Sequence, residues 1–574
     1  MDAKKEYAFW LEDSYFDEET KEELRSIAED ENEIEERFCR NLEFGTGGLR
    51  GVIGAGTNRM NIYTVRKATQ GLADYIKGQG TEKKGAAIAY DSRNMSKEFA
   101  EEAALCFAAN GIKAYIFPSL RPTPQLSFAL MELGCTAGVV VTASHNPAEY
   151  NGYKVYWEDG AQITAPRDQE IIRAVNGVTD FHRIKTMDKE KAAESGLYEV
   201  IGADLDDRYM DALKKLAIHP EIINEEAENL KIVYTPLHGT GNLPVRRILK
   251  ELGFTKVYVV KEQEEPDGNF PTVPYPNPED AKAFTLALEL AEKVGADIVL
   301  ATDPDADRLG VYAKDKRTGE YRSFTGNMSG MLILEYILSQ RRALGTLPEN
   351  GAVVTTIVSG KMAGEITKEY HVKLIETLTG FKYIGEQIKF FEQTHEYEYL
   401  FGYEESYGCL AGSYARDKDA IGAVMALCEA AAWCKHQGIT LCDQMEKLYQ
   451  TYGYYKEGLS TITLKGQEGI RKISEIMERI RSEVPEQIGG LQVTKFRDYR
   501  KDVLIDFEAG TKTTTGLPAS NVLYFELEGG TWCCVRPSGT EPKVKFYIGV
   551  KGRNEKEAEE KLSKMTDAVK CLAE

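Results

Sequence analysis

Basic residues are in short supply in this chain: 71 Lys and Arg stand against 91 Asp and Glu, which gives a formal net charge of -20. A nucleic-acid-binding or anionic-membrane-binding surface needs clustered Lys and Arg, so this balance argues against both partners. Residues 1–30 lack the apolar core of a signal peptide, and no apolar stretch is long enough to cross a bilayer. Any anionic ligand must therefore be attracted by a local group of cations.

Cysteine pairs are also scarce. The ten cysteines include no CxxC motif, and the adjacent Cys533 and Cys534 lie in an apolar, strand-like run. This spacing disfavours zinc sites and disulfides and favours reduced thiols within a core, which is typical of a cytoplasmic protein. At 574 residues the chain is long enough for three or four domains with substantial cores.

Short Val-, Ile- and Ala-rich runs alternate with amphipathic segments over most of the chain, a rhythm that predicts βαβ units. Predicted strands span residues 86–90, 112–117, 137–142, 231–235, 256–260, 296–302, 352–358, 372–378 and 399–402. Predicted helices span residues 97–110 (with Ser96 as N-cap), 125–133, 244–252, 281–294 and 328–344. Mostly parallel sheets bind ligands at the carboxyl ends of their strands, so we expect function in the loops there.

After about residue 450 the rhythm changes to predicted strands at 459–464, 521–527, 531–536 and 544–550, followed by a charged helix from Glu555. The fold class is therefore predicted to be three consecutive mixed or parallel-sheet α/β domains and a C-terminal α+β domain around a central cleft. The predicted domains are 1–205, 206–322, 323–450 and 451–574, with the polar stretch 437–457 as the last connector and the run 185–207 at the first boundary.

Residues Thr142-Ala-Ser-His-Asn-Pro147 follow a predicted strand and offer Ser144 as a nucleophile beside His145. A serine hydroxyl needs activation, which a flanking histidine, an Asn-Pro turn and nearby cations could supply. Lys154 follows a predicted Gly turn at 150–154 and is expected to return to the serine as a proton carrier, if neighbouring cations lower its pKa. The alternatives are an ordinary ST-turn and a solvated surface lysine.

Asp303, Asp305 and Asp307 occupy alternate positions after another predicted strand. In an extended segment such residues point the same way, so the three carboxylates can converge on one hard cation, and oxygen ligands favour magnesium. A calcium EF-hand loop would need Gly and Glu where Arg308 and Lys314 stand, which excludes it. An acidic turn without metal remains an alternative, and Arg308 could hold a phosphate at the edge of the metal site.

Four further segments offer groups suited to a sugar phosphate. One of them, the anion loop, combines the charge of Arg536 with hydroxyl groups and with a glycine that lets the backbone approach a phosphate closely. The other segments supply groups that could bind sugar hydroxyls, a basic loop of the size that fits a phosphate, and an arginine on a flexible loop. A generic surface turn is the alternative for each of them. The candidate residues are Arg536, Ser538, Gly539 and Thr540 in the anion loop, Glu404 and Ser406, Thr379, Gly380 and Lys382, and Arg50 in a glycine-rich loop.

Five motifs in sequence order give the chain a resemblance to the α-D-phosphohexomutase family, the phosphoglucomutases and phosphomannomutases. They are Gly45-Thr-Gly-Gly-Leu-Arg50, Thr142-Ala-Ser-His-Asn-Pro147, Asp303-Pro-Asp-Ala-Asp-Arg308, Glu404-Glu-Ser406 and Arg536-Pro-Ser-Gly-Thr540. The resemblance covers nearly the whole chain. It implies four domains around one cleft and an intramolecular phosphotransferase.

The resemblance also implies roles for the candidate residues. Ser144 is expected to be phosphorylated at rest, with Mg²⁺ held by Asp303, Asp305, Asp307 and the phosphoserine oxygen. His145 and Lys154 are expected near the transferred group, and Arg308 beside the metal. The substrate contacts implied are Glu404 and Ser406 on sugar hydroxyls, and Arg536, Ser538 and Thr540 on the distal phosphate.

The implied reaction interconverts glucose 1-phosphate and glucose 6-phosphate, with glucose 1,6-bisphosphate as intermediate and activator. Tyr403 stands where several members have Gly, and Pro304 and Ala306 replace glycines of the metal loop. In these departures the chain resembles a long branch of the family that includes phosphopentomutases and glucose 1,6-bisphosphate synthases. Phosphopentomutase, phosphomannomutase, bisphosphate synthase and a catalytically silent sugar-phosphate-binding protein are therefore alternatives. The expected partners are small-molecule sugar phosphates, and the chain is expected to be a monomer or homodimer.

Overall fold

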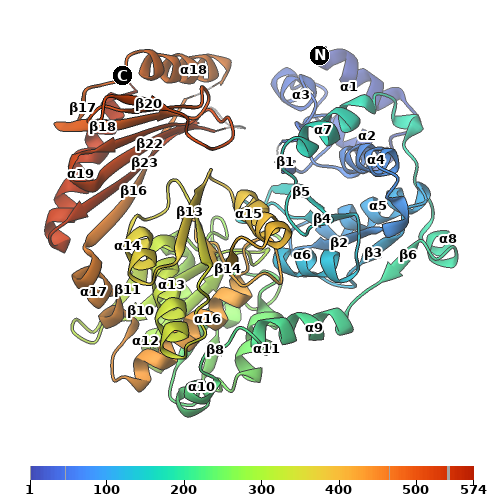
Figure 1. Cartoon of the computed structure of the whole chain (residues 1–574). Coiled ribbons are helices and arrows are strands. Elements are labelled where there is room, and N and C mark those ends of the chain that lie inside the picture. The colour runs from blue at the N-terminus through green and yellow to red at the C-terminus, as the bar shows by residue number, and fades with distance from the viewer. Residues whose placement is uncertain (1, 46, 465, 539–542, 574) are drawn as a thin grey trace. The chain divides into compact units, whose positions relative to one another are not determined.

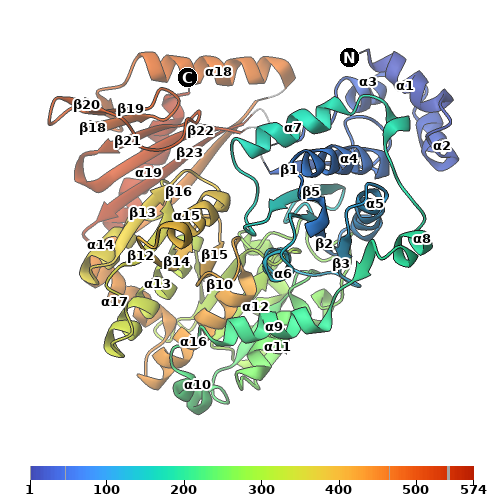
Figure 2. The same ribbon diagram turned by 45° about the vertical axis from the view of Figure 1, so that its right-hand side comes forward.

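The computed structural model describes residues 2–45, 47–464, 466–538 and 543–573, and its elements are labelled in Figures 1 and 2. By its internal contacts the chain divides into two compact units, each of which is described by itself. The first unit contains Met1–Ser329, Phe381–Gly402 and Ser406–Leu441, and the second contains Gly330–Gly380, Tyr403–Glu405 and Cys442–Glu574.

The first unit begins with a six-stranded sheet in the order β1-β5-β4-β2-β3-β6. Its strands are β1 (Gly48–Val52), β2 (Ala86–Tyr90), β3 (Ala114–Ile116), β4 (Ala137–Val141), β5 (Tyr150–Trp157) and β6 (Tyr198–Val200). β2 pairs in parallel with β3 and β4, and β3 pairs in parallel with β6. The predicted βαβ unit is therefore confirmed, and β2 has the predicted bounds.

Five of the helices in this region pack against the sheet through apolar residues. Residues of α4, α5 and α7 share one core with the sheet, and residues of α6 and α9 share a second core (Figure 1). The helices are α1 (Ala3–Glu12), α2 (Glu18–Ser26), α3 (Glu31–Phe38), α4 (Ile62–Gly78), α5 (Ser96–Ala109), α6 (Thr123–Glu132), α7 (Arg167–Gly177), α8 (Lys189–Glu194) and α9 (Ala203–Lys214). Ser96 is not the N-cap that was predicted: Met95 occupies that position, and the Ser96 hydroxyl donates to Asp91 at 2.7 Å.

The predicted Gly turn at 150–154 is wrong, because these residues form the first half of β5. This strand lies antiparallel to both β1 and β4. A Cβ atom on Gly152 would lie 2.5 Å from the Thr142 carbonyl oxygen and 2.8 Å from that of Leu49. The glycine is therefore needed for close strand packing rather than for a turn.

A second, five-stranded sheet follows in the order β11-β10-β9-β7-β8. Its strands are β7 (Ile232–Thr235), β8 (Val257–Val259), β9 (Ile298–Thr302), β10 (Leu309–Lys314) and β11 (Tyr321–Phe324). β7 is parallel to β8 and β9, whereas β10 is antiparallel to β9 and β11. The helices of this part are α10 (Pro220–Glu226), α11 (Asn242–Glu251) and α12 (Thr285–Val294). The buried strand β9 ends at Thr302, immediately before the three aspartates.

The first unit also contains elements from later in the sequence. They are α15 (Phe381–Thr394), most of β14 (Glu398–Tyr403), β15 (Cys409–Ala411) and α16 (Ala420–His436). The stretch 437–457 contains α17 (Leu441–Tyr452), and its predicted role as a connector between domains stays a prediction. Met445, Leu448 and Tyr449 are buried at helical spacing, which the polar residues between them concealed.

The second unit contains α13 (Gly326–Ala343) from Gly330 onward, β12 (Gly351–Thr356), α14 (Met362–Glu369) and β13 (Lys373–Thr377), with β12 and β13 parallel. An eight-stranded sheet forms its C-terminal part. The strands are β16 (Tyr454–Thr463), β17 (Gln487–Ile488), β18 (Leu491–Asp498), β19 (Val503–Asp506), β20 (Thr511–Thr513), β21 (Leu523–Leu527), β22 (Thr531–Pro537) and β23 (Lys543–Gly552).

Two helices, α18 (Gly466–Ser482) and α19 (Glu555–Cys571), share one hydrophobic core with this C-terminal sheet (Figure 2). Short 3₁₀ helices elsewhere span Glu82–Lys84, Phe181–Arg183, Lys261–Gln263, Ala281–Phe284 and Glu528–Gly530. The predicted fold class, α/β regions followed by an α+β region, is confirmed. The four predicted domain boundaries stay predictions.

All ten cysteines are free thiols, as predicted, and eight of them are buried. Burial raises the pKa of Cys106, Cys135 and Cys533 to about 12, because a thiolate is poorly solvated inside the core. A search of the described helices for a span that is both long and apolar enough for a bilayer finds none.

Candidate active site

Ser144 lies in the loop that follows β4, with a side chain that is almost completely buried. Its φ angle is 53°, in the left-handed region that a residue other than glycine seldom adopts. Such a conformation costs about 1–3 kcal/mol and persists only where surrounding contacts fix it. One of these contacts is local, since the Ser144 N–H donates to the Thr142 hydroxyl at 2.8 Å. The serine is thus presented on a tight, strained turn.

The Ser144 hydroxyl donates to Asp303 Oδ2 at 2.7 Å, and it lies 3.1 Å from His145 Nδ1. Burial, together with the positive charges of Arg308 and Arg50, holds the pKa of His145 well below its ordinary value. The imidazole is therefore neutral near pH 7 and can exchange a hydrogen bond with the serine. The structure brings together two motifs that are far apart in the sequence.

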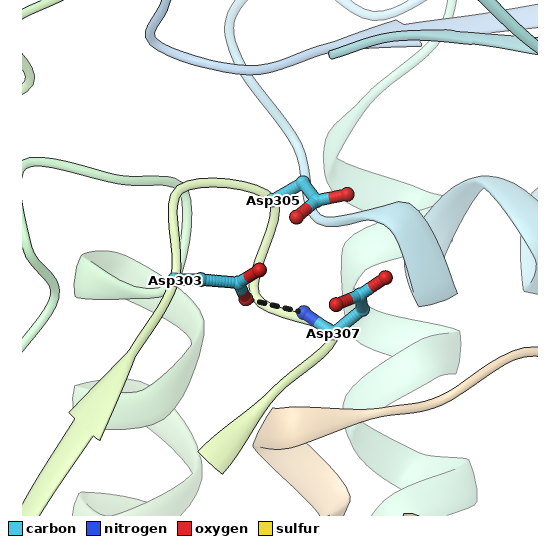
Figure 3. A group of neighbouring side chains, drawn as sticks. All are labelled: Asp303, Asp305 and Asp307. Atoms are coloured by element: carbon cyan, nitrogen blue, oxygen red, sulfur yellow. Dashed lines mark hydrogen bonds between the residues drawn. The ribbon is translucent and has the colours of Figure 1, made fainter. Parts of the chain in front are cut away.

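The three predicted metal ligands do converge: one oxygen atom from each of Asp303, Asp305 and Asp307 lies within 4.8 Å of the others (Figure 3). The expected extended segment is wrong, however. The loop turns at Ala306, whose φ is 50°, and Asp303 Oδ1 accepts the Asp307 and Arg308 N–H groups, each at 3.1 Å. The carboxylates converge because the backbone wraps around Asp303, not because alternate side chains share a face.

Two lysines partly balance these buried carboxylates. Lys154 Nζ lies 2.7 Å from Asp305 Oδ2 and 3.4 Å from Asp307 Oδ2, and Lys418 Nζ lies 3.2 Å from Asp307 Oδ2. Burial lowers the pKa of Lys154, but the charges of Asp305 and Asp307 outweigh it and raise the pKa overall. The expectation of a lowered lysine pKa is therefore wrong for these contacts: two carboxylates, rather than cations, surround the ammonium group.

The same contacts shift the pKa values of these carboxyl groups in different directions. Burial, reinforced by the charges of Asp305 and Asp307, holds the pKa of Asp303 well above its ordinary value. Burial also opposes ionisation of Asp305, but the ion pair with Lys154 outweighs it and lowers the pKa of Asp305. Asp303 is thus the carboxyl group whose ionisation the surroundings oppose most, and a divalent cation bound beside it would favour its charged form.

The donor set fits such a cation. Asp305 Oδ1 and Asp307 Oδ1 are buried and have no hydrogen-bond partner among the residues described. Buried carboxylate oxygens normally find partners, so these two atoms are available as ligands. Oxygen-only ligands suit Mg²⁺ better than a transition metal.

Three residues near these loops were missed by the motif analysis. Thr123, the first residue of α6, donates its hydroxyl to Asp305 Oδ2 at 2.9 Å, and its N–H donates to the Asp305 carbonyl at 2.9 Å. Arg93, just after β2, contacts the serine loop through its guanidinium group. Lys418 precedes α16 in the charged run Arg416-Asp-Lys-Asp419. For Arg93 and Lys418 the sequence offered one signal, their position: Arg93 follows a strand and Lys418 precedes a helix.

The two predicted arginines also lie near the centre. Arg50 belongs to β1, and its Nη1 donates to Asn146 Oδ1 at 3.2 Å. Arg308 forms an ion pair with Glu279, and its Nε lies 3.8 Å from Asp307 Oδ1. Ser144, His145, Lys154, the three aspartates and both arginines are therefore grouped in the first unit.

The candidate sugar and phosphate residues are distributed over both units. Lys382 and Ser406 belong to the first unit, whereas Thr379, Gly380, Glu404, Arg536 and Ser538 belong to the second. Gly539 and Thr540 lie outside the described residues. The Ser538 N–H donates to the Lys543 carbonyl at 2.7 Å, which closes the base of the anion loop.

Glu405, which the motif analysis did not single out, accepts a hydrogen bond from the Thr356 hydroxyl at 2.9 Å within the second unit. Burial and the charge of Glu404 raise the pKa of Glu405 to about 7. The motif Glu404-Glu-Ser406 therefore carries a carboxyl group whose pKa is about 7. An adjacent pair of glutamates in the sequence is the signal that could have revealed it.

Family models described as phosphoglucomutase/phosphomannomutase α/β/α domains I, II and III match residues 41–181, 207–318 and 325–452. The phosphoglucomutase of Staphylococcus aureus strain MSSA476 is 37% identical over 544 residues, or 94% of this chain and 96% of the relative. That of Staphylococcus saprophyticus is 36% identical over 513 residues, or 89% of this chain and 91% of the relative.

Two solved structures show a similar fold. A putative phosphomannomutase from Thermus thermophilus has a TM-score of 0.68 at 21% identity and covers 93% of this chain and 99% of its own. The open form of pp63/parafusin, a phosphoglucomutase from Paramecium, has a TM-score of 0.67 at 17% identity and covers 92% and 95%. The matches define a phosphotransferase of the isomerase class. The chain belongs to the phosphoglucomutase/phosphomannomutase family.

Proposed function

We propose that this enzyme interconverts glucose 1-phosphate and glucose 6-phosphate, with Ser144 as the residue that carries the phosphoryl group. The observation that carries the proposal is the 2.7 Å hydrogen bond from the Ser144 hydroxyl to Asp303, inside a group of three buried carboxylates. The similarity to phosphoglucomutases over 94% of the chain supports glucose phosphates as substrates.

The reaction consists of two transfers. Phosphoserine 144 gives its phosphoryl group to the free hydroxyl of the hexose monophosphate: a new P–O bond to the sugar forms, and the P–O bond to Ser144 breaks. The resulting glucose 1,6-bisphosphate turns around in the site. Its other phosphoryl group then passes to Ser144, which restores the phosphoenzyme and leaves the isomeric monophosphate. Glucose 1,6-bisphosphate is thus both intermediate and activator.

In this scheme the residues of the first unit orient the serine and manage its proton. Asp303 accepts the hydrogen bond of the free Ser144 hydroxyl and fixes the direction of its Oγ. His145, which is partly buried, and Lys154, which is buried, are the candidates to exchange the proton of the reacting hydroxyl. Arg50 and Arg308 add positive charge where the transferred group would lie.

Asp303, Asp305 and Asp307, with an oxygen of phosphoserine 144, would hold Mg²⁺, which when bound stabilises the negative charge of the phosphoryl group during transfer. The Oδ1 atoms of Asp305 and Asp307, which accept no hydrogen bond from the described residues, support this assignment.

Substrate contacts are assigned to the remaining candidates. Glu404 and Ser406 would bind sugar hydroxyls, and Arg536 with the rest of its loop would bind the phosphate that is not being transferred. The full set of proposed substrate-binding residues is Thr379, Gly380, Lys382, Glu404, Ser406, Arg536, Ser538, Gly539 and Thr540. Each contact must accept the sugar in both orientations, because both phosphates visit the same serine.

An initial-rate assay tests the proposal. The enzyme, with Mg²⁺ and a trace of glucose 1,6-bisphosphate, is offered glucose 1-phosphate, mannose 1-phosphate and ribose 1-phosphate separately. We expect the highest kcat/KM with glucose 1-phosphate. A tenfold preference for mannose or ribose phosphate, about 1.4 kcal/mol at the transition state, would assign a different sugar. Net release of bisphosphate without isomerisation would identify a synthase, and no turnover of any sugar would contradict the proposal.

A further inference from the structure

Arg93 holds the backbone of the serine loop. Its guanidinium Nε donates to the Ser144 carbonyl at 3.2 Å, and Nη2 donates to the same carbonyl at 2.6 Å and to that of Asn146. Its Nη1 donates to the carbonyls of Pro147 and Tyr150 at 2.8 and 3.0 Å. Arginine has five N–H groups, so these contacts use the whole donor capacity of the side chain.

This arginine is buried, with 3% of its surface exposed, and its charge is balanced within the same region. Asp91 Oδ2 lies 3.5 Å from Arg93 Nε and accepts the Thr142 hydroxyl at 2.6 Å. Thr142 in turn accepts the Ser144 N–H. The network therefore reaches Ser144 from both sides, through its N–H by way of Asp91 and Thr142, and through its carbonyl by way of Arg93.

A left-handed residue that is not glycine relaxes unless its surroundings fix it. At Ser144 the two peptide groups on either side of the strained φ angle are those that the network binds. Arg93 therefore determines where Ser144 Oγ points, although the arginine does not touch the hydroxyl in the contacts described.

Arg93 also relates the serine loop to the part of the first unit that carries the aspartates. Its guanidinium carbon lies 5.0 Å from the centre of the Phe270 ring, in cation–π contact. The adjacent Asn94 donates its side-chain amide to Asn269 at 2.9 Å. Phe270 and Asn269 belong to the same α/β region as Asp303, so one segment sets both the shape of the serine loop and its position relative to the carboxylates.

We propose that Arg93 is a positioning residue for phosphoryl transfer at Ser144, acting through the loop backbone and through Phe270. This inference rests on the proposed function. A lysine at this position would keep the positive charge but would present three donors from one atom, which cannot reach carbonyls spread over residues 144–150. The charge-conserving substitution therefore separates geometry from electrostatics.

The test compares Arg93→Lys with Arg481→Lys in the full-length enzyme. Arg481 is a matched control, because it is also buried and binds Asp498, Glu478 and Asn521 in the C-terminal sheet region. We expect kcat to fall about 100-fold in Arg93→Lys, with KM for glucose 1-phosphate within about threefold of the wild type. The initial rate of phosphate transfer from ³²P-labelled glucose 1,6-bisphosphate to the enzyme should fall in parallel. Arg481→Lys should lower the melting temperature while kcat of the folded fraction stays near the wild-type value.

Equal losses of kcat in the two lysine variants would show that Arg93 acts only on stability and would overturn the inference, as would an unchanged kcat in Arg93→Lys. Should Arg93→Lys not fold, Phe270→Leu takes its place, with an expected decrease in kcat of about fivefold at unchanged KM; an unchanged kcat there counts equally against the inference. Ser144→Ala distinguishes the two claims. If it still takes up labelled phosphate like the wild type, the proposed function fails, whereas label uptake that is lost in Ser144→Ala but normal in Arg93→Lys refutes the inference alone.

Discussion

The serine loop at 142–147 and the aspartate loop at 303–307 both follow buried strands, yet they are stabilised in opposite ways. The backbone carbonyls of the serine loop are bound by a buried guanidinium group from outside the loop, that of Arg93. In the aspartate loop, backbone N–H groups bind one carboxylate, and two other carboxylate oxygens accept no hydrogen bond from the described residues. One loop is complete in the protein itself, and the other has ligand atoms for an added cation. The protein itself therefore fixes the position of Ser144, whereas the charge beside Ser144 would change if a cation bound to the aspartate loop.

Removing the proposed nucleophile should have the largest effect. Ser144→Ala deletes the oxygen that we propose receives the phosphoryl group, so we expect kcat to fall on the order of 10⁴-fold or more, while binding of glucose 1-phosphate persists. Coupled-enzyme rates and isothermal titration calorimetry measure the two quantities. Ser92→Ala is a suitable control at a neighbouring strand end. Residual activity above a hundredth of the wild type would contradict the assignment of Ser144.

The aspartate loop is tested next. Asp305→Asn keeps the side-chain shape but removes a ligand charge, so Mg²⁺ affinity should fall and kcat should decrease about 10²–10³-fold. Chelation of Mg²⁺ should abolish turnover of the wild type, and added Mg²⁺ should restore it. Calorimetry of Mg²⁺ binding gives a readout independent of activity.

Asp315→Asn, on the hairpin after β10 and paired with Arg317, provides the matched control and should bind Mg²⁺ like the wild type. Undiminished Mg²⁺ affinity in Asp305→Asn would place the metal elsewhere. The aspartate loop would then no longer differ from the serine loop by binding a cation.

Lys154→Met probes how the aspartate loop tolerates its own charge. Removing one partner of a buried ion pair typically costs about 3–5 kcal/mol, so the metal-free variant should be destabilised by this order. Mg²⁺ should then raise the melting temperature of this variant more than that of the wild type, because the cation neutralises carboxylate charge that Lys154 balances in the wild type. Lys314→Met, whose ion pair with Glu292 is at the surface, is the control. A similar Mg²⁺ response in all three proteins would show that Lys154 does not share the charge of this loop.

The smallest expected effect concerns Glu405 in the second unit. Its pKa of about 7 in the folded state exceeds the ordinary 4.5, so the folded protein binds the extra proton between these values. The associated stability is present below pH 4.5 and is lost as pH rises through 7. Glu405→Gln, which cannot ionise, should therefore gain about 1–3 kcal/mol over the wild type on going from pH 4.5 to pH 8.

Melting temperatures of the two proteins across this pH range measure the difference. Glu365→Gln, on the exposed surface of α14, should follow the wild type at every pH. Parallel profiles for Glu405→Gln and the wild type would mean that Glu405 titrates normally.

Local sequence patterns predicted several of the strands and the positions of the loops that follow them well. The buried run 86–90 and the strand ends before Ser144 and Asp303 follow from apolar composition and loop residues alone. The failures were of a different kind. Gly152 suggested a turn, but its role is to allow close packing against the carbonyl groups of Thr142 and Leu49. The sequence does not show that these two residues lie beside Gly152.

The residues that complete the site could not be predicted for the same reason. Arg93 is 51 positions from Ser144, and Thr123 is 182 positions from Asp305. Neither periodicity nor a motif connects such pairs, because the contacts arise from how β2, β4 and α6 pack in three dimensions. The direction of the Lys154 pKa shift likewise depends on which charges the fold places beside the ammonium group.

The buried thiols make this chain its own set of local unfolding probes. Cys106 and Cys135 lie in the first α/β region, Cys428 and Cys434 on α16, and Cys533 and Cys534 in the C-terminal sheet. A thiol with no solvent access reacts with an alkylating reagent only after its surroundings open. Pulsed alkylation followed by peptide mass spectrometry would therefore time the opening of each region separately, without any engineered label.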